Sequence, residues 1–200
     1  MHICSSFYSH DDVTSSIARR REALQAATKL YESPTPGVYV VEARTGAGIF
    51  DELFFCLIVE GSGRYDALIH GGVPIGMVVL TPPPVFKNID TIRPPSYVKT
   101  PHCGIVREHA RRGIMSGMYR RLLNDGHFFV TGGRQTPTAE RLWLKLSKEF
   151  ELNCVDRKYG TPTQYKEPGQ WLYTLHDPRL FTVQSLLQPD FSTAPTRVSL

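Results

Sequence analysis

IVREHARRGIMSGMY, residues 105–119, is the most informative stretch of this chain. An apolar strand end runs into an arginine-rich turn, and a helix is expected to begin beyond Gly113. The first turn of a helix has backbone N–H groups without partners and carries the positive end of the helix dipole. Such a turn binds phosphate groups through its backbone. The stretch therefore predicts a site for a phosphorylated cofactor.

The residues after Gly113 predict a helix, a stop and a second strand. Apolar side chains recur at helical spacing from Ile114 to Leu123. Residues 124–126 read NDG, which is typical of a helix end. Residues 127–131, HFFVT, then predict a short buried strand. We therefore expect the order strand, turn, helix, strand across this region.

A second helix is expected after this strand and a short glycine-containing loop. Thr136 is a good N-cap, and Pro137 is a good first residue of a helix. The apolar residues that follow share one helical face, as in an amphipathic helix. They are Ala139, Leu142, Trp143, Leu146 and Phe150.

This order of elements resembles the cofactor-binding core of the GNAT superfamily of N-acetyltransferases. The family turn usually reads Arg or Gln, two residues, Gly, one residue, then Gly or Ala. Here Gly113 takes the central position, whereas Ala110 and Met115 depart from the pattern. The later family helix often reads Asn-x-x-Ala-x-x-Leu-Tyr, and residues 136–143 read TPTAERLW. Trp143 in place of the tyrosine is similar to GNAT-like proteins encoded by bacteriophages.

The resemblance covers roughly residues 64–175 and implies a fold. That fold is α/β, with a mixed, mostly antiparallel central sheet, a splayed pair of parallel strands and flanking helices. It implies a single domain over residues 1–200. Residues 1–63 would add a helical and strand part, and residues 176–200 a C-terminal extension.

The resemblance also implies acetyl-CoA as the cofactor. The pantetheine arm would pair with the strand end, and the pyrophosphate would rest on the amides of the turn. The residues it assigns to CoA are Ile105, Val106, Arg107, Arg111, Arg112, Gly113, Ile114, Met115, Ser116, Thr136, Ala139 and Trp143. No metal is implied.

Acetyl transfer to an amine requires a base that removes the ammonium proton. The candidates near the strand end are Glu108, His102 and His109. The family often uses a tyrosine as the acid for the departing thiolate, but indole donates a hydrogen bond without passing on a proton. The tyrosines that could replace it are Tyr159, Tyr119 and Tyr165.

Composition and charge are those of a globular protein. The chain has 200 residues, 41% hydrophobic and 21% charged, with a formal net charge of +4. Arginines gather at residues 19–21, 107–112 and 120–121. We interpret the first and last groups as solvated helix faces. No interleaved aromatic platform accompanies them, so nucleic-acid binding is not favoured.

The cysteines and the apolar runs indicate a cytoplasmic protein. The spacing of Cys4, Cys56, Cys103 and Cys154 is not that of metal ligands. Cys56 and Cys103 fall in predicted strands and are expected to be buried apolar residues. No apolar run is long enough to span a bilayer, and no signal sequence is recognised, so no membrane is expected.

The other predicted elements follow from periodicity and turn residues. A connection over residues 81–96 is rich in proline and either borders the acceptor or is a plain surface excursion. The predicted elements are a strand at 1–9, a helix at 11–31, strands at 38–44, 52–60, 98–106, 152–155 and 170–175, and a hairpin of 64–70 with 74–81. Residues 176–200 are either a short docked helix or a partner-binding tail.

The leading hypothesis is an acetyl-CoA-dependent N-acetyltransferase that acts on an amine of a protein or small molecule. The alternative is a catalytically weak or inactive protein of the same fold that binds and modulates a host protein. A nucleic-acid-binding regulator that uses the arginines at 19–21 and 120–121 ranks third. A homo-oligomer is left open.

Overall fold

The computed structural model describes residues 10–45, 52–60, 69–83, 95–131, 136–156, 161–164 and 171–187. The chain divides into two compact units. Unit 1 comprises Met1–Thr81 and His102–Tyr119, and unit 2 comprises Pro82–Pro101 and Arg120–Leu200. The chain passes from one unit to the other within strand β5 (Val98–Ile105) and within helix α3 (Ile114–Asn124). Among the described residues, no helix is long and apolar enough to cross a membrane.

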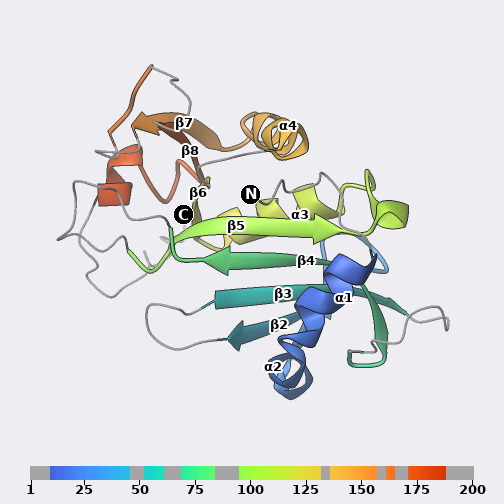
Figure 1. The fold of residues 1–200 in the computed structure, drawn as a ribbon. Coiled ribbons are helices and arrows are strands. Elements are labelled where there is room, and N and C mark those ends of the chain that lie inside the picture. Colours follow the sequence, from blue (N-terminus) through green and yellow to red (C-terminus); the bar gives the residue numbers. More distant parts are fainter. Residues whose placement is uncertain are drawn as a thin grey trace. The chain divides into compact units, whose positions relative to one another are not determined.

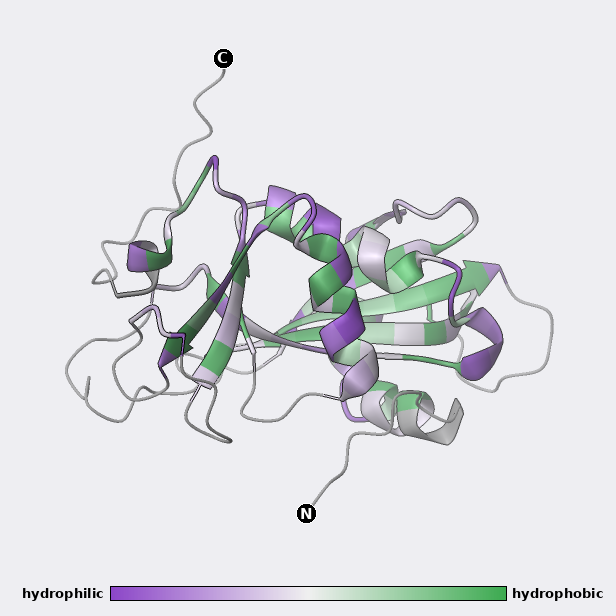
Figure 2. Ribbon diagram, turned by 90° about the horizontal axis from the view of Figure 1, so that it is seen from above, coloured by the Kyte–Doolittle hydropathy of each residue, from purple (hydrophilic) through white to green (hydrophobic). Residues whose placement is uncertain are grey.

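Unit 1 is built on antiparallel strands that pair with their neighbours in sequence (Figure 1). The strands β3 and β4 are apolar on both faces and almost wholly buried, and Figure 2 shows the central strands as mostly hydrophobic. The amide of Val106, just beyond β5, donates to the carbonyl of Ile75 in β4 at 2.9 Å. The strands are β1 (Lys29–Glu32), β2 (Tyr39–Thr45), β3 (Glu52–Glu60) and β4 (Gly72–Thr81).

The structure corrects the single helix predicted over residues 11–31. Two short helices, α1 (His10–Ala18) and α2 (Arg21–Ala26), are separated at Arg20, whose φ of −121° is not helical. Residue Tyr31 lies in β1, because this segment pairs with β2. Val13, Ile17 and Leu24, three of the apolar residues expected on one face of that helix, are buried, whereas Ala27 is only half-buried. Helix α1 packs on β4 and α2 on β2.

The hairpin predicted around Gly71 is also corrected. Strand β4 lies between β3 and β5 in the sheet order and pairs with β3 in a register that runs from Glu60 opposite Gly72 to Leu53 opposite Leu80. Among the described residues near the predicted turn, a single bridge joins Ile69 to Gly72. The rest of the predicted partner strand, residues 64–68, lies outside the described residues, as do the predicted strand 1–9 and residues 84–94 of the proline-rich connection.

Unit 2 contains the parallel strand pair. The start of β5 pairs in parallel with β6 through Val98 opposite Phe128 and Lys99 opposite Phe129. The remaining described pairings are antiparallel, so the predicted mixed, mostly antiparallel sheet is confirmed. The single-domain organisation stays a prediction. The other elements of this unit are β6 (Phe128–Val130), α4 (Pro137–Leu146), β7 (Glu151–Asp156), β8 (Trp171–His176) and the 3-10 helix η3 (Val183–Leu187).

The core of unit 2 forms around Phe128. Its ring stacks on His176 and meets Phe181 edge-on. The ring of Tyr97 stacks on Phe181, and its hydroxyl donates to the carbonyl of Ser185 in η3 at 3.1 Å. The short docked helix expected after residue 176 is therefore present as η3, and residues 188–200 lie outside the described residues.

Candidate functional site

The turn between β5 and α3 has the backbone geometry of an anion-binding turn. The chain leaves β5 through the 3-10 helix η2 (Arg107–His109) and then places Arg111 at φ 62° and Gly113 at φ 81°. Around left-handed residues of this kind, backbone N–H groups form concavities that bind anions. A Cβ on Gly113 would meet only Ser116 Oγ, at 3.9 Å, so glycine is favoured here by its φ angle and not by lack of space.

A run of backbone amides is open at this turn. The amides of His109 and Ala110 donate back within the turn, at 3.0 and 3.1 Å, and Gly117 makes the first helical bond, to Gly113 at 2.8 Å. Between them, no backbone carbonyl of the described residues accepts a bond from the amides of residues 111–116. These groups lie at the positive end of the α3 dipole, where a phosphate is stabilised.

Three arginines belong to this turn. The side chains of Arg107, Arg111 and Arg112 are all exposed. Arg112 Nη1 lies 3.1 Å from Nδ1 of His109. Burial lowers the pKa of His109 and the Arg112 charge lowers it further, whereas Glu108 opposes both effects. Guanidinium groups in solvent at a helix start are suited to charge-assisted hydrogen bonds with phosphate oxygens.

The side chains of Ser116 and Met115 make contacts within the turn and with β4, respectively. Ser116 Oγ donates to the carbonyl of Gly113 at 2.9 Å. The Cε of Met115 would lie 3.2 Å from a Cβ built on Gly76, so this side chain covers β4. The same Cβ would stand 2.8 Å from the carbonyl oxygen of Gly104, where β4 and β5 approach closely. The methionine at the departing motif position therefore packs on the sheet.

The apolar residues assigned to the cofactor have structural roles in unit 1. Val106 and Ile114 are buried, and Ile105 is half-buried. Because the amide of Val106 bonds to Ile75, it is already used within the sheet. These residues hold the turn in place beside β4.

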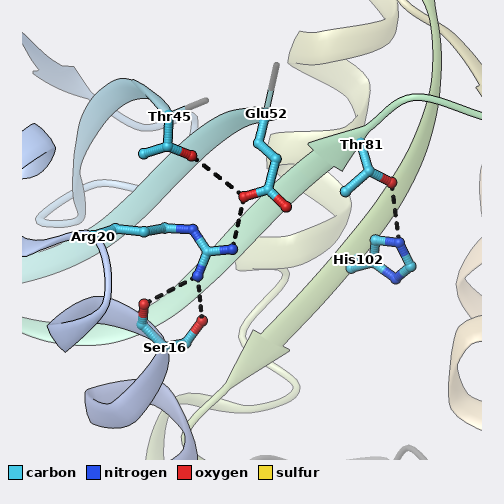
Figure 3. A network of polar contacts seen from close by, with 6 residues as sticks. All are labelled: Ser16, Arg20, Thr45, Glu52, Thr81 and His102. Carbon is cyan, nitrogen blue, oxygen red and sulfur yellow. Dashed lines mark hydrogen bonds and ion pairs between the residues drawn. The ribbon is translucent and has the colours of Figure 1, made fainter. Parts of the chain in front are cut away.

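Among the proposed bases, His102 stands on the exposed side of β5. Its Nε2 lies 3.3 Å from Oγ1 of Thr81 at the end of β4 (Figure 3). The protein packed around the ring lowers the pKa of His102, and the Glu52 carboxylate acts in the opposite direction. A lowered pKa keeps the imidazole neutral at neutral pH, which is the form that accepts a proton.

The other catalytic candidates differ in placement. Glu108 is exposed in η2. Tyr119 is buried in α3, with 2% of its surface exposed. The predicted acids Tyr159 and Tyr165 lie outside the described residues.

The residues predicted on the second helix belong to unit 2. Thr136 is the N-cap of α4 and accepts a hydrogen bond from the amide of Ala139 at 3.1 Å, as predicted. Trp143 is 3% exposed and lies with Leu146 on the buried face of α4, whereas Phe150, predicted on the same face, is buried beyond the end of the helix at Leu146. The hydroxyl of Thr136 is therefore engaged in capping, and the indole of Trp143 is buried.

A polar network that sequence reasoning missed lies at the ends of β2, β3 and β4 (Figure 3). Arg20, interpreted from sequence as part of a solvated run, has a side chain only 16% exposed and pairs with Glu52 at 2.8 Å. The interpretation holds better for residues 120–121, since Arg120 and Arg121 make surface ion pairs with Glu149 and Asp125. The flanking arginines at 19 and 21 are exposed, so nothing in the run itself singled out Arg20.

The described cysteines behave as packing residues. Cys56 is buried in β3, and burial raises the pKa of its thiol to about 12. Cys103, expected to be buried, is half-buried in β5. Within the described ranges, no group of histidine, cysteine and carboxylate side chains is arranged to hold a metal ion.

No protein-family model and no curated protein sequence matches this chain. Several solved structures are similar to it, including two acetyltransferases. One is a chimera of the spermidine N-acetyltransferase SpeG from Vibrio cholerae and hSSAT, with 10% identity, a TM-score of 0.34 and coverage of 86% of this chain and 83% of the other. The second is the ribosomal-protein-S5-alanine acetyltransferase from Vibrio fischeri, with 10% identity, a TM-score of 0.34 and coverage of 84% and 88%. At this level of similarity, a function has to be argued from the chain's own residues.

Proposed function

We propose that this chain is a GNAT-type N-acetyltransferase that uses acetyl-CoA to acetylate an amine of a protein or small molecule. The observation that carries the proposal is the turn before α3. It combines left-handed Arg111 and Gly113 with an open run of amides at a helix start and with exposed arginines. This is the arrangement that phosphate groups require when no metal is used.

In this proposal, backbone amides and arginine side chains of unit 1 bind the cofactor in different ways. The amides of residues 111–116 would hold the pyrophosphate, and Arg107, Arg111 and Arg112 would balance its charge. Met115 leaves room because its side chain reaches β4, and the Ser116 hydroxyl bonds to the carbonyl of Gly113 and not to an amide of the turn. When bound, acetyl-CoA supplies the acetyl group as an activated thioester.

His102 is the general base in this proposal. It is partly exposed on β5, three residues before Ile105, which corresponds to about 10 Å along an extended strand. Its lowered pKa favours the neutral imidazole that takes the proton of an ammonium acceptor. His109 is less suited, because its Nδ1 is paired with Arg112.

One observation favours the alternative of a binding protein without catalysis. The position that the resemblance gives to the acid holds Trp143, which is 3% exposed and has no proton to pass on. A thiol with an ordinary pKa of about 8.5 is a fair leaving group without an acid, so the transferase proposal stands despite this position. The alternative predicts a host partner that is captured equally with and without acetyl-CoA.

The transferase proposal is tested first by thermal unfolding with and without millimolar acetyl-CoA at moderate salt. A ligand that binds the native state raises the melting temperature. Gly113→Trp should abolish this rise, because a bulky side chain would cover the open amides. The matched control is Gly126→Trp, since Gly126 has φ 91°, follows the other end of α3 and has nothing within 4 Å of a built Cβ. An undiminished rise in Gly113→Trp would rule out this site, and absence of any rise in the native chain would remove the proposal.

A further inference from the structure

The carboxylate of Glu52 is held at the end of the unit 1 sheet by contacts from two sides. Glu52 opens β3 opposite Thr45, the last residue of β2. Its Oε2 accepts a bond from Arg20 Nη2 at 2.8 Å and one from Thr45 Oγ1 at 3.3 Å (Figure 3). The two donors converge on one oxygen and so restrict how the carboxylate can turn.

Arg20 is itself fixed by several contacts. Its Nη1 donates to both the carbonyl and the hydroxyl of Ser16, at 3.1 and 3.2 Å. The guanidinium carbon lies 4.8 Å from the centre of the Phe54 ring. The planar fork of arginine makes these contacts together, whereas a lysine ammonium is a point charge on a flexible stem and cannot reproduce them.

The second oxygen of Glu52 faces the candidate base. No hydrogen bond from the described residues reaches Oε1, and Figure 3 shows this oxygen on the side of the network where Thr81 and His102 lie. Glu52 is also the charged group of the described residues that acts on the His102 imidazole. The carboxylate therefore links Arg20, at the junction of α1 and α2, with His102 on β5.

We propose that Arg20 is a positioning residue for His102, which acts by holding the Glu52 carboxylate with one oxygen turned toward the imidazole. The inference rests on the proposed function, in which His102 accepts the proton of the amine. Arg20 touches neither the acceptor nor the thioester in this scheme. Its effect reaches His102 only through the position of Glu52.

The test follows the titration of the His102 ring protons by NMR, without acetyl-CoA. Glu52→Gln should move the titration midpoint to lower pH, because the negative charge that favours the imidazolium is removed. Arg20→Lys keeps the positive charge but loses the planar guanidinium that holds Glu52, so the His102 midpoint should move in the same direction. The double variant Arg20→Lys/Glu52→Gln should have the same His102 midpoint as Glu52→Gln alone. The matched control is Arg21→Lys, the same substitution at the exposed neighbouring residue, which should leave the midpoint unchanged.

Two results would overturn the proposal. The first is a His102 titration midpoint in Arg20→Lys that equals the midpoint in the native chain. The second is a change of the midpoint by Arg20→Lys that is the same size whether residue 52 is glutamate or glutamine. Far-UV circular dichroism verifies folding, and Ser16→Ala gives a milder variant that removes only one of the contacts of Arg20. The titration needs no cofactor. The His102 midpoints could therefore move as expected in a chain that shows no transferase activity. That result would contradict the proposed function but support the positioning of Glu52 by Arg20.

Discussion

The imidazole of His176 lies flat against the ring of Phe128, with ring centres 4.6 Å apart and planes 7° apart. The histidine is fully buried, and neither ring nitrogen makes a hydrogen bond to the described residues, although Nε2 lies 3.6 Å from Oε2 of Glu151. Burial lowers the pKa of His176, against the opposing charges of Glu151 and Asp177. Unit 2 therefore accommodates this imidazole in its neutral form.

This relationship predicts a loss of stability on acidification. Because the folded-state pKa of His176 lies below that of the unfolded chain, the unfolded state binds more protons between the two values. The contribution of neutral His176 to the stability of the fold is fully present above the ordinary histidine pKa. It is lost as the pH falls toward the lower pKa that His176 has in the folded state. We expect the melting temperature to fall from about pH 7.5 to about pH 5.5, across the ordinary pKa of roughly 6.5, and to fall less in His176→Phe. Equal slopes in the two proteins would contradict this account.

Gly76→Ala should destabilise the chain by about 1–3 kcal/mol, as overpacking does in cores. The new Cβ would stand 2.8 Å from the carbonyl oxygen of Gly104, a backbone atom that cannot move aside cheaply. Urea unfolding measures the loss. Met115→Ala in the same chain removes the 3.2 Å contact with Met115 Cε but leaves the backbone contact, so it should not restore stability. If Met115→Ala restored the full stability of the Gly76→Ala chain, the destabilisation would come from the methionine contact and not from the close spacing of the strands.

Thr136→Ala should cost about 0.5–2 kcal/mol, the usual value for loss of an N-cap. The hydroxyl of Thr136 accepts from the amide of Ala139 at 3.1 Å, so that amide should exchange with solvent faster in the variant. Hydrogen exchange followed by NMR gives the local effect. Thr136→Ser keeps the acceptor oxygen and serves as the control, so an alanine variant as protected as the serine variant would argue against the cap.

If His102 is the base, kcat/KM for acetyl transfer should rise with pH to a midpoint below the ordinary histidine pKa and then level off. The lowered pKa places the neutral form on the plateau at neutral pH. His102→Gln should reduce kcat/KM by roughly 10²–10⁴, the usual contribution of a general base. His109→Gln is the matched control. A larger loss in the His109 variant than in the His102 variant would assign the base to the turn.

The parts that sequence analysis predicted well are those governed by local chemistry. Thr136 followed by Pro137 starts α4, and the strand and stop signals around α3 agree with the structure. Capping and periodicity depend on neighbours within a few residues, which the sequence displays directly. The open amides near Gly113 follow from the same local rules.

The predictions that the structure corrects depend on contacts between residues far apart in the sequence. Tyr31 was placed in a helix because its spacing fits one, but pairing with β2 draws residues 29–32 into a strand. Arg20 resembled its solvated neighbours, yet it reaches Glu52 across 32 residues. Such contacts depend on which strands pair and in which register, and local propensity is overridden there.

By itself, the sequence determined the order strand, turn, helix, strand and helix from β5 to α4, the turn at Gly113 and the cap at Thr136, because each rests on backbone preferences of nearby residues. Only the tertiary structure decided that Arg20 pairs with Glu52, that the Glu52 charge acts on His102, and that Met115 covers Gly76. The physical reason is sheet register. The pairing of β2, β3 and β4 sets which side chains meet at the strand ends, and a shift by one residue would turn each of them to the opposite face.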